Sequence, residues 1–386
     1  MSAADVELYG SAAASLSLLK VPVLLHAENP HQRLFFSFFD GTGNDVNSDG
    51  EHAASVGKFA LHLLDKPSDK RIFPAYVAGP GTQPFFVQKV VDGAIGYSYY
   101  GRLERMYRAL VKQAAIWGND DPEIQLAVVS AGFSRGAEQA AGFTRMVHER
   151  GIQTKGADGT HQLIPPGQIP QVVALFDPVG TGHPHAHDRR LPPSVVSGFQ
   201  IYARDERRNL FPATQIIRPG LSADGRFLGV VVPGAHSDIG GGYHADGLSV
   251  INGNLMTDFI NAHSDVPLLE HQPVPLDPSR YVISHPCEHA LFEAKRGHVT
   301  PVTAIGFGKG AQGEFCPAFH VMQAFDGNVD DARTRWASFD ASQAVMQSVG
   351  QTNAPLEATN EHLQQRQLGR EHELARQPDV GLSMRM

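Results

Sequence analysis

The feature that most constrains the fold is an apolar run that ends in a tight turn around a serine. Residues 124–131 are mostly β-branched or small, and the next five, Gly132–Gly136, read Gly-Phe-Ser-Arg-Gly. A strand that ends in Gly-x-Ser-x-Gly and continues into a helix is the context of a nucleophile elbow. The glycines let strand and helix pass close together, because neither carries a side chain. We therefore predict that Ser134 is a nucleophile whose hydroxyl is exposed above the end of the strand.

The rest of the chain alternates between apolar runs and segments with helical spacing. Short apolar runs predict strands at 34–39, 72–77, 124–130, 172–176 and 227–232, with further candidates at 279–283 and 299–305. Apolar residues at helical spacing predict helices over 51–65, 99–117, the residues after 134, and 249–263. Gly, Pro and polar residues over 151–169 predict a surface connection. This order predicts an α/β fold of the α/β-hydrolase type, with a mostly parallel sheet and helices on both faces.

Composition and charge narrow the classes of protein that the chain can be. Hydrophobic residues make up 42% and charged residues 19%, as in globular proteins. The net charge of −8 gives no basic surface for nucleic acid, so we expect no nucleic-acid partner. No apolar run is long enough to span a bilayer, and no basic segment precedes the first apolar patch, so we expect synthesis in the cytoplasm without a Sec signal. The two cysteines, Cys287 and Cys316, could be free or bridged.

The domain organisation that we predict has three parts. Residues 1–25 form an N-terminal leader, residues 26–340 form the catalytic domain, and residues 341–386 form a polar C-terminal tail that is helical or disordered. The tail is assigned from its content of Gln, Glu, Arg, Asn and His.

Polar residues follow the ends of several predicted strands. Asp40, Ser134, Asp177 and His236 each come directly or almost directly after an apolar run. The carboxyl ends of parallel strands share one edge of the sheet, where α/β folds place their sites. A serine needs a base to take its proton, and the base needs a third group to fix its tautomer. We predict Ser134 as nucleophile, Asp177 as acid and His236 as base, in the chain order of α/β-hydrolases.

Other residues compete for two of these roles. Asp238 and Asp188 are the rival acids, although Asp238 is only two residues from His236. His244 and His263 are the rival bases. His236 is preferred because it follows a strand directly and precedes a run of three glycines at 240–242.

Stabilising the oxyanion requires two N–H donors. The first is expected from the backbone of Arg135, the residue after the nucleophile, and the second from the loop after an earlier strand. The turn that contains Gly41 and Thr42 is in that place. We therefore predict an oxyanion hole made by Arg135, Gly41 and Thr42.

Several weaker signals point elsewhere. Residues 45–50 match the first half of a calcium loop, but its twelfth position is not Glu, so Ca²⁺ is only a weak candidate and no cofactor is predicted. The histidines within 182–187 fit a solvated loop better than a metal site. The apolar stretch 84–97 could be a lid, or a packed connection before the long helix. Asp205 and Glu206 are assigned to ion pairs with a neighbouring arginine and to no catalytic role.

Taken together, the motifs resemble those of the type VI secretion phospholipase effectors, a family of serine hydrolases. The matching segments are Phe39–Asn44, Gly132–Ala137, Asp177–Gly180, the Asp-Glu-x-Arg and Phe-Pro residues of 205–212, and His236–Tyr243.

The resemblance implies Ser134, Asp177 and His236 as the triad of a phospholipase A or lipase that cleaves acyl esters at a membrane surface. It also implies secretion by the type VI apparatus into the periplasm of a target cell, with delivery proteins and an immunity protein as partners. Two alternatives stay open from the sequence. One is an esterase or thioesterase for small soluble acyl substrates, and the other is a non-catalytic binding module with a hydrolase fold.

Overall fold

The structure, a computed structural model, describes residues 1–65, 69–80, 99–156, 159–180, 188–206, 208, 211 and 213–284. Its centre is a seven-stranded sheet in the order β2-β1-β3-β6-β7-β9-β8. The strands, in that order, are Ile72–Val77, Gln32–Phe39, Gln125–Phe133, Gln171–Phe176, Val195–Ala203, Phe227–Val232 and Gly220–Leu221. All neighbours are parallel except β8, which pairs antiparallel with β9. The predicted α/β fold with a mostly parallel sheet is confirmed.

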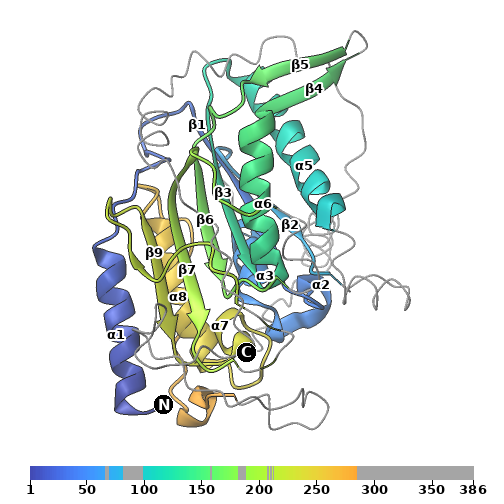
Figure 1. Cartoon of the computed structure of the whole chain (residues 1–386). Helices are drawn as coiled ribbons and strands as arrows, with labels where there is room; N and C mark the ends of the chain where they lie inside the picture. The colour runs from blue at the N-terminus through green and yellow to red at the C-terminus, as the bar shows by residue number, and fades with distance from the viewer. Residues whose placement is uncertain are drawn as a thin grey trace, which may run out of the picture.

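Helices cover both faces of this sheet (Figure 1). On one face lie α5 (Tyr99–Asp120) and α6 (Arg135–Arg150), and on the other lie α1 (Ala3–Ser17), α3 (Ser55–Asp65) and α8 (Gly247–Asn261). Alternate residues of β1 enter different cores, with Phe36 and Phe38 on the α8 side and Phe35 and Phe39 on the α6 side. A strand buried on both faces is apolar at most positions, which explains the nearly continuous apolar run at 34–39.

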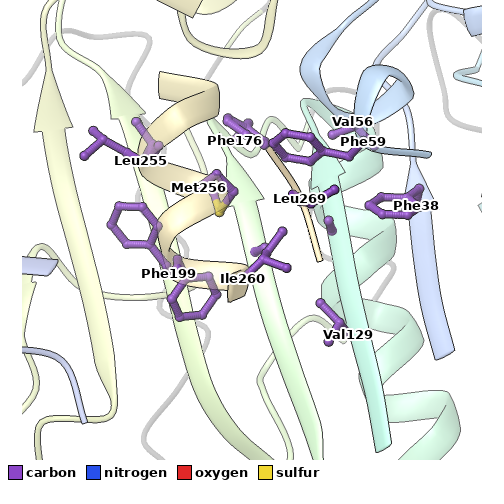
Figure 2. Close-up of a cluster of buried hydrophobic side chains, with 14 of the residues drawn as sticks. Phe38, Val56, Phe59, Val129, Phe176, Phe199, Leu255, Met256, Ile260 and Leu269 are labelled. Carbon is purple, nitrogen blue, oxygen red and sulfur yellow. The ribbon is translucent and has the colours of Figure 1, made fainter. Parts of the chain in front are cut away.

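The larger core lies between the sheet and α8 (Figure 2). Met256 and Ile260 of α8 point toward the sheet, where Phe199 of β7 and Phe176 of β6 meet them. All four side chains are fully buried. This layer fixes the position of β6, whose carboxyl end is followed by the candidate acid Asp177.

Short elements lie at the carboxyl edge of the sheet. They are α2 (Val46–Asp49), the 3-10 helix η1 (Gly50–His52) and α7 (His236–Gly240). In Figure 1 the arrowheads of the central strands point toward this edge. The hairpin of β4 (Ile152–Gly156) and β5 (Gly159–Ile164) projects from the opposite end.

The observed elements differ from the predicted ones in several places. The segment predicted as a surface connection contains the β4–β5 hairpin, and β7 is absent from the predicted strands. The strand predicted at 279–283 is wrong, because residues Pro278–Tyr281 form the 3-10 helix η2. Asp277 caps this turn by accepting a hydrogen bond from the N–H of Ser279, and proline is favoured at such a start. The candidate strand 299–305 lies outside the described residues.

The N-terminal residues pack against the sheet. Helix α1 begins with a capping box, in which Ser2 and Asp5 each accept the other's backbone N–H. Tyr9 and Ala12 belong to the same core as α8 and β9. The leader predicted for 1–25 therefore contains a helix that shares the core of the sheet. The predicted boundary at 340 and the tail 341–386 lie outside the described residues. In the part of the chain that the structure describes, no helix is long and apolar enough to cross a membrane.

Candidate active site

The candidate nucleophile lies in a sharp turn between β3 and α6. Ser134 has a φ of +59° and directly precedes Arg135, the first residue of the helix. A Cβ at Gly132 would lie 2.4 Å from the carbonyl oxygen of Gly136, and a Cβ at Gly136 would lie 2.2 Å from that of Phe39. The close approach predicted for the two glycines is therefore present, and it brings α6 against the end of β1 as well as β3.

The turn after β3 is hydrogen-bonded to the turn after β6. The N–H of Ser134 donates to the carbonyl of Phe176 at 3.0 Å, and the N–H of Val179 donates to the carbonyl of Ser134 at 3.3 Å. Asp177, which follows Phe176, has a φ of +37°. Among the described residues other than glycine, only Ser134 and Asp177 have positive φ. Such strained backbone is costly and concentrates at functional sites.

The candidate base is in contact with the candidate acid. His236 is the first residue of α7, and its Nδ1 lies 2.7 Å from Oδ2 of Asp177. The other carboxylate oxygen, Oδ1, accepts the backbone N–H of Ala203 at 3.0 Å. Because an ionised carboxylate only accepts hydrogen bonds, Nδ1 carries the proton and Nε2 is the basic nitrogen. A neutral imidazole in this tautomer can take a proton from a serine hydroxyl.

Two aromatic rings flank the imidazole. The ring centroid of Phe133 lies 4.6 Å from that of His236, and the centroid of Phe211 lies 4.9 Å from it. These contacts restrict how the ring can turn, since a rotated imidazole would have to displace a phenyl group. Neither phenylalanine is among the predicted site residues. The only sequence signal for them is that each lies inside a matching segment, Phe133 within Gly132–Ala137 and Phe211 within 205–212.

The candidate nucleophile and base are both largely buried, so less of Ser134 is exposed than the sequence predicts. Ser134 and His236 are each only 3% exposed. The side chain of Arg135, next to the serine, reaches across the edge of the sheet, where its Nε donates to the hydroxyl of Thr42. The loop after β1 is thus linked to the start of α6.

The predicted oxyanion residues also meet at this edge. The contact between Arg135 and Thr42 places the loop after β1 beside the elbow. The N–H of Gly41, however, donates to Oδ1 of Asp40 at 2.7 Å. Among the described residues no acceptor is found for the N–H of Thr42, which makes Thr42 the better donor from this loop.

Asp40 is fully buried beneath that loop. Its Oδ2 accepts a hydrogen bond of 2.7 Å from the hydroxyl of Tyr76 on β2. Burial raises the pKa of Asp40 to about 6, although the hydrogen bonds from Tyr76 and Gly41 act in the opposite direction. Asp40 therefore holds the start of the loop and does not face His236 as Asp177 does.

The rival acids have other partners. Asp238 accepts the N–H of Ala235 at 2.9 Å, which caps its own helix, and also the N–H of Ser284 at 2.9 Å. Asp188 forms an ion pair of 2.8 Å with Arg190. The structure brings neither carboxylate but Asp177 into contact with the His236 ring.

The rival bases are also engaged elsewhere. His263 is buried at the end of α8, where its Nδ1 contacts the carbonyl of Phe259 at 2.9 Å. Burial lowers the pKa of His263 to about 4. The ring of His244 packs against that of His52, with centroids 4.2 Å apart. Both histidines therefore have local packing roles.

The weak calcium signal has a local explanation. Asp45 caps α2 by accepting the N–H of Asn47 at 3.0 Å, and Asp49 accepts the N–H of Asp45 at 2.7 Å. These carboxylates thus stabilise the turn that contains them. Across the described ranges, no three His, Cys, Asp or Glu side chains gather as metal ligands would. The histidines of 182–187, the stretch 84–97 and both cysteines lie outside those ranges.

Comparison with protein families gives one match, to "T6SS, Phospholipase effector Tle1-like, catalytic domain", over residues 33–165. The resemblance to type VI phospholipase effectors is confirmed. The matched residues contain the loop after β1 and the elbow, but neither Asp177 nor His236. Comparison with curated proteins gives no match.

Similar solved structures include the following two. An uncharacterized protein from Pseudomonas aeruginosa is 19% identical, with a TM-score of 0.42, over 72% of this chain. A Tle1 effector, solved bound to the VgrG spike of the type 6 secretion system, is 20% identical, with a TM-score of 0.37, over 58% of this chain. The match covers 52% of each of those chains, about half their length.

Proposed function

We propose that this Tle1-like chain is a serine-dependent phospholipase A or lipase. The observation that carries the proposal is the 2.7 Å contact between His236 Nδ1 and Asp177 Oδ2, at the edge where Ser134 occupies a strained elbow. An acid that fixes the tautomer of a histidine, at the same sheet edge as such a serine, is what acyl transfer by a triad requires. The family match supports phospholipid as the source of the acyl ester.

In the proposed reaction, Nε2 of His236 takes the proton of the Ser134 hydroxyl while its oxygen attacks the ester carbonyl. The backbone N–H groups of Arg135 and Thr42 would stabilise the oxyanion that forms. The imidazolium, paired with Asp177, then protonates the departing lysophospholipid alkoxide. Water, activated by the same His236, hydrolyses the acyl-enzyme and releases a fatty acid.

We further propose that the type VI apparatus delivers the protein into the periplasm of a target cell and that an immunity protein protects the producing cell. Support comes from the family match, and the Tle1 effector solved on a VgrG spike suggests a spike protein as the delivery partner. Co-purification of the chain with a VgrG protein from the same organism tests the delivery step. Failure of every VgrG protein of that organism to bind would argue against it.

A fluorophosphonate probe tests the chemistry directly, because it labels only a serine that an adjacent base activates. We expect labelling of the wild type and none of Ser134→Ala. Ser11→Ala, which changes an exposed serine of α1, is the matched control and should label like the wild type. A correctly folded wild type that takes no label would favour the non-catalytic alternative.

The lipid assignment needs a second assay. Phospholipid vesicles and a water-soluble p-nitrophenyl ester are offered to the wild type and to Ser134→Ala. We expect release of fatty acid from vesicles by the wild type alone. Activity confined to the soluble ester would replace the phospholipase assignment with that of an esterase.

A further inference from the structure

The backbone of the turn that carries His236 is held by a short charged segment, which consists of Arg204, Asp205, Glu206 and Arg208. Oδ2 of Asp205 accepts the N–H of Gly234 at 2.9 Å, and the N–H of Asp205 donates to the carbonyl of Gly234 at 2.9 Å. Oε2 of Glu206 accepts the N–H of His236 itself at 3.2 Å. Two adjacent carboxylates thus bind the turn on both sides of its middle residue.

Each of these carboxylates has an arginine partner in the same segment. Arg204 pairs with Asp205 at 2.9 Å and Arg208 pairs with Glu206 at 2.8 Å. The Glu206 side chain is 7% exposed and that of Arg208 is 11% exposed, so water and salt screen this pair weakly. Burial alone would raise the pKa of Glu206, but the hydrogen bonds and charge of Arg208 outweigh it and lower the pKa of this carboxyl. Glu206 is therefore an anion beside the histidine.

The same segment also reaches the imidazole through an aromatic ring. The Cζ of Arg208 lies 3.6 Å from the ring centroid of Phe211, close enough for a cation–π contact. The Phe211 ring lies 4.9 Å from that of His236. Backbone and ring of the histidine are thus both linked to the Glu206–Arg208 pair.

We infer that Glu206 and Arg208 are positioning residues for His236. They fix its backbone, and their charges set the electrostatic environment of its imidazole ring. The inference rests on the proposed function, in which His236 is the base. It assigns a role to the buried pair that ion pairing alone does not explain, since a pair needed only for stability need not contact the base. Neither residue touches the reacting atoms.

The sign of the charge effect can be worked out from the groups around the ring. Asp177 contacts the ring, Glu206 accepts the backbone N–H of His236, and Arg208 pairs with Glu206. Asp238 lies two residues further along α7, and Tyr243 interacts electrostatically with Glu206 and Arg208. Glu206→Gln keeps an acceptor for the His236 N–H but removes a negative charge, so the imidazolium becomes less stable. Arg208→Gln removes a positive charge and leaves Glu206 without this partner, so the imidazolium becomes more stable. The two substitutions must therefore move the titration of the ring in opposite directions.

The titration is measured by NMR of [¹³C]histidine-labelled protein in a Ser134→Ala background, where no turnover occurs. The signal of the ring is assigned by its loss in His236→Asn. We expect the titration midpoint to fall in Glu206→Gln and to rise in Arg208→Gln. Glu7→Gln, which changes an exposed carboxyl of α1, should leave it unchanged. Midpoints that stay at the wild-type value in both variants, or move in the same direction, overturn the inference.

Labelling kinetics in the Ser134 protein separate this inference from the proposed function. Glu206→Gln should slow fluorophosphonate labelling about 5–10-fold, because the hydrogen bond from the His236 N–H to a charged acceptor is replaced by a weaker one to a neutral amide. The labelling rate rises with pH as the histidine loses its proton. This rise should move to lower pH in Glu206→Gln and to higher pH in Arg208→Gln. Labelling of Glu206→Gln at the wild-type rate overturns the positioning role while the proposed function stands. If the wild type takes no label, the proposed function is wrong. The NMR titration would still show whether Glu206 and Arg208 shift the titration of the His236 ring.

Discussion

Replacing Gly136 by alanine tests the packing on which the elbow depends. The added Cβ would lie 2.2 Å from the carbonyl oxygen of Phe39 and 2.5 Å from that of Asp40. Both atoms belong to the backbone at the end of β1, where the N–H of Asp40 donates to Val77 of β2. The strand end is held by its neighbours and cannot retreat alone. The backbone of Gly136 itself is compatible with alanine, because it is helical and lacks a positive φ.

The expected magnitude follows from two opposing effects. Alanine in a helix interior is favoured over glycine by about 1 kcal/mol. Overpacking in a filled interior costs about 1–3 kcal/mol, and contacts this close to two backbone atoms place Gly136→Ala near the upper end. The net loss in the free energy of unfolding is therefore about 2 kcal/mol. For a domain of this size, that lowers the thermal midpoint by roughly 4–8 °C.

The assay is thermal and urea unfolding followed by far-UV circular dichroism. The matched control is Gly101→Ala in α5, where an added Cβ meets no atom within 4 Å. It should gain about 0.5–1 kcal/mol, since only the conformational preference changes. Fluorophosphonate labelling of Gly136→Ala should fall as well, because the elbow shifts with the helix. If Gly136→Ala proves as stable as Gly101→Ala, the close approach of α6 to β1 is not what requires glycine here.

Two further substitutions test the site. Asp177→Asn should slow labelling of Ser134 about 10³–10⁴-fold with an unchanged far-UV spectrum, because an amide can stabilise the wrong tautomer of His236; a loss below tenfold would contradict the acid's role. Burial raises the pKa of Asp40 to about 6 from 3.8, so its protonated form favours folding. This contribution is complete below about pH 4 and is lost as the pH rises through 6, on the order of 3 kcal/mol in all. The stability of the wild type relative to Asp40→Asn should therefore fall between pH 4 and pH 7 in urea titrations, and a constant difference would contradict it.

Most of the strands that sequence analysis finds are buried on both faces and consist largely of apolar residues. β1, β3, β6 and β9 are of this kind, and their apolar runs are visible without any tertiary information. The sequence does not predict β7, because Ser197, Gly198 and Gln200 interrupt its run of apolar residues. Gln200 is fully buried and is tolerated there because it donates to the carbonyl of Thr214 and accepts the N–H of Ile217. Those partners come from a later loop, which no local pattern reveals.

Some features of the candidate site could likewise be predicted from the sequence, and others could not. The elbow is a local motif, and Asp177 and His236 follow strands that the sequence identifies, so their meeting at one edge could be predicted. The contact between the side chains of Arg135 and Thr42 could not be predicted, because these residues follow different strands. The contact of Glu206 with the backbone of His236, thirty residues later, is equally invisible in the sequence.

The sequence by itself determined the alternation of strands and helices, the glycine-flanked turn around Ser134, and the polar residues that follow the strands. These depend on the residues next to each other in the chain. Only the tertiary structure decided that Asp177 pairs with the imidazole while Asp238 caps a helix, and that the N–H of Gly41 is taken by Asp40. Hydrogen bonds and burial act over a few ångströms in space, and the order of the strands in the sheet sets which distant residues come that close.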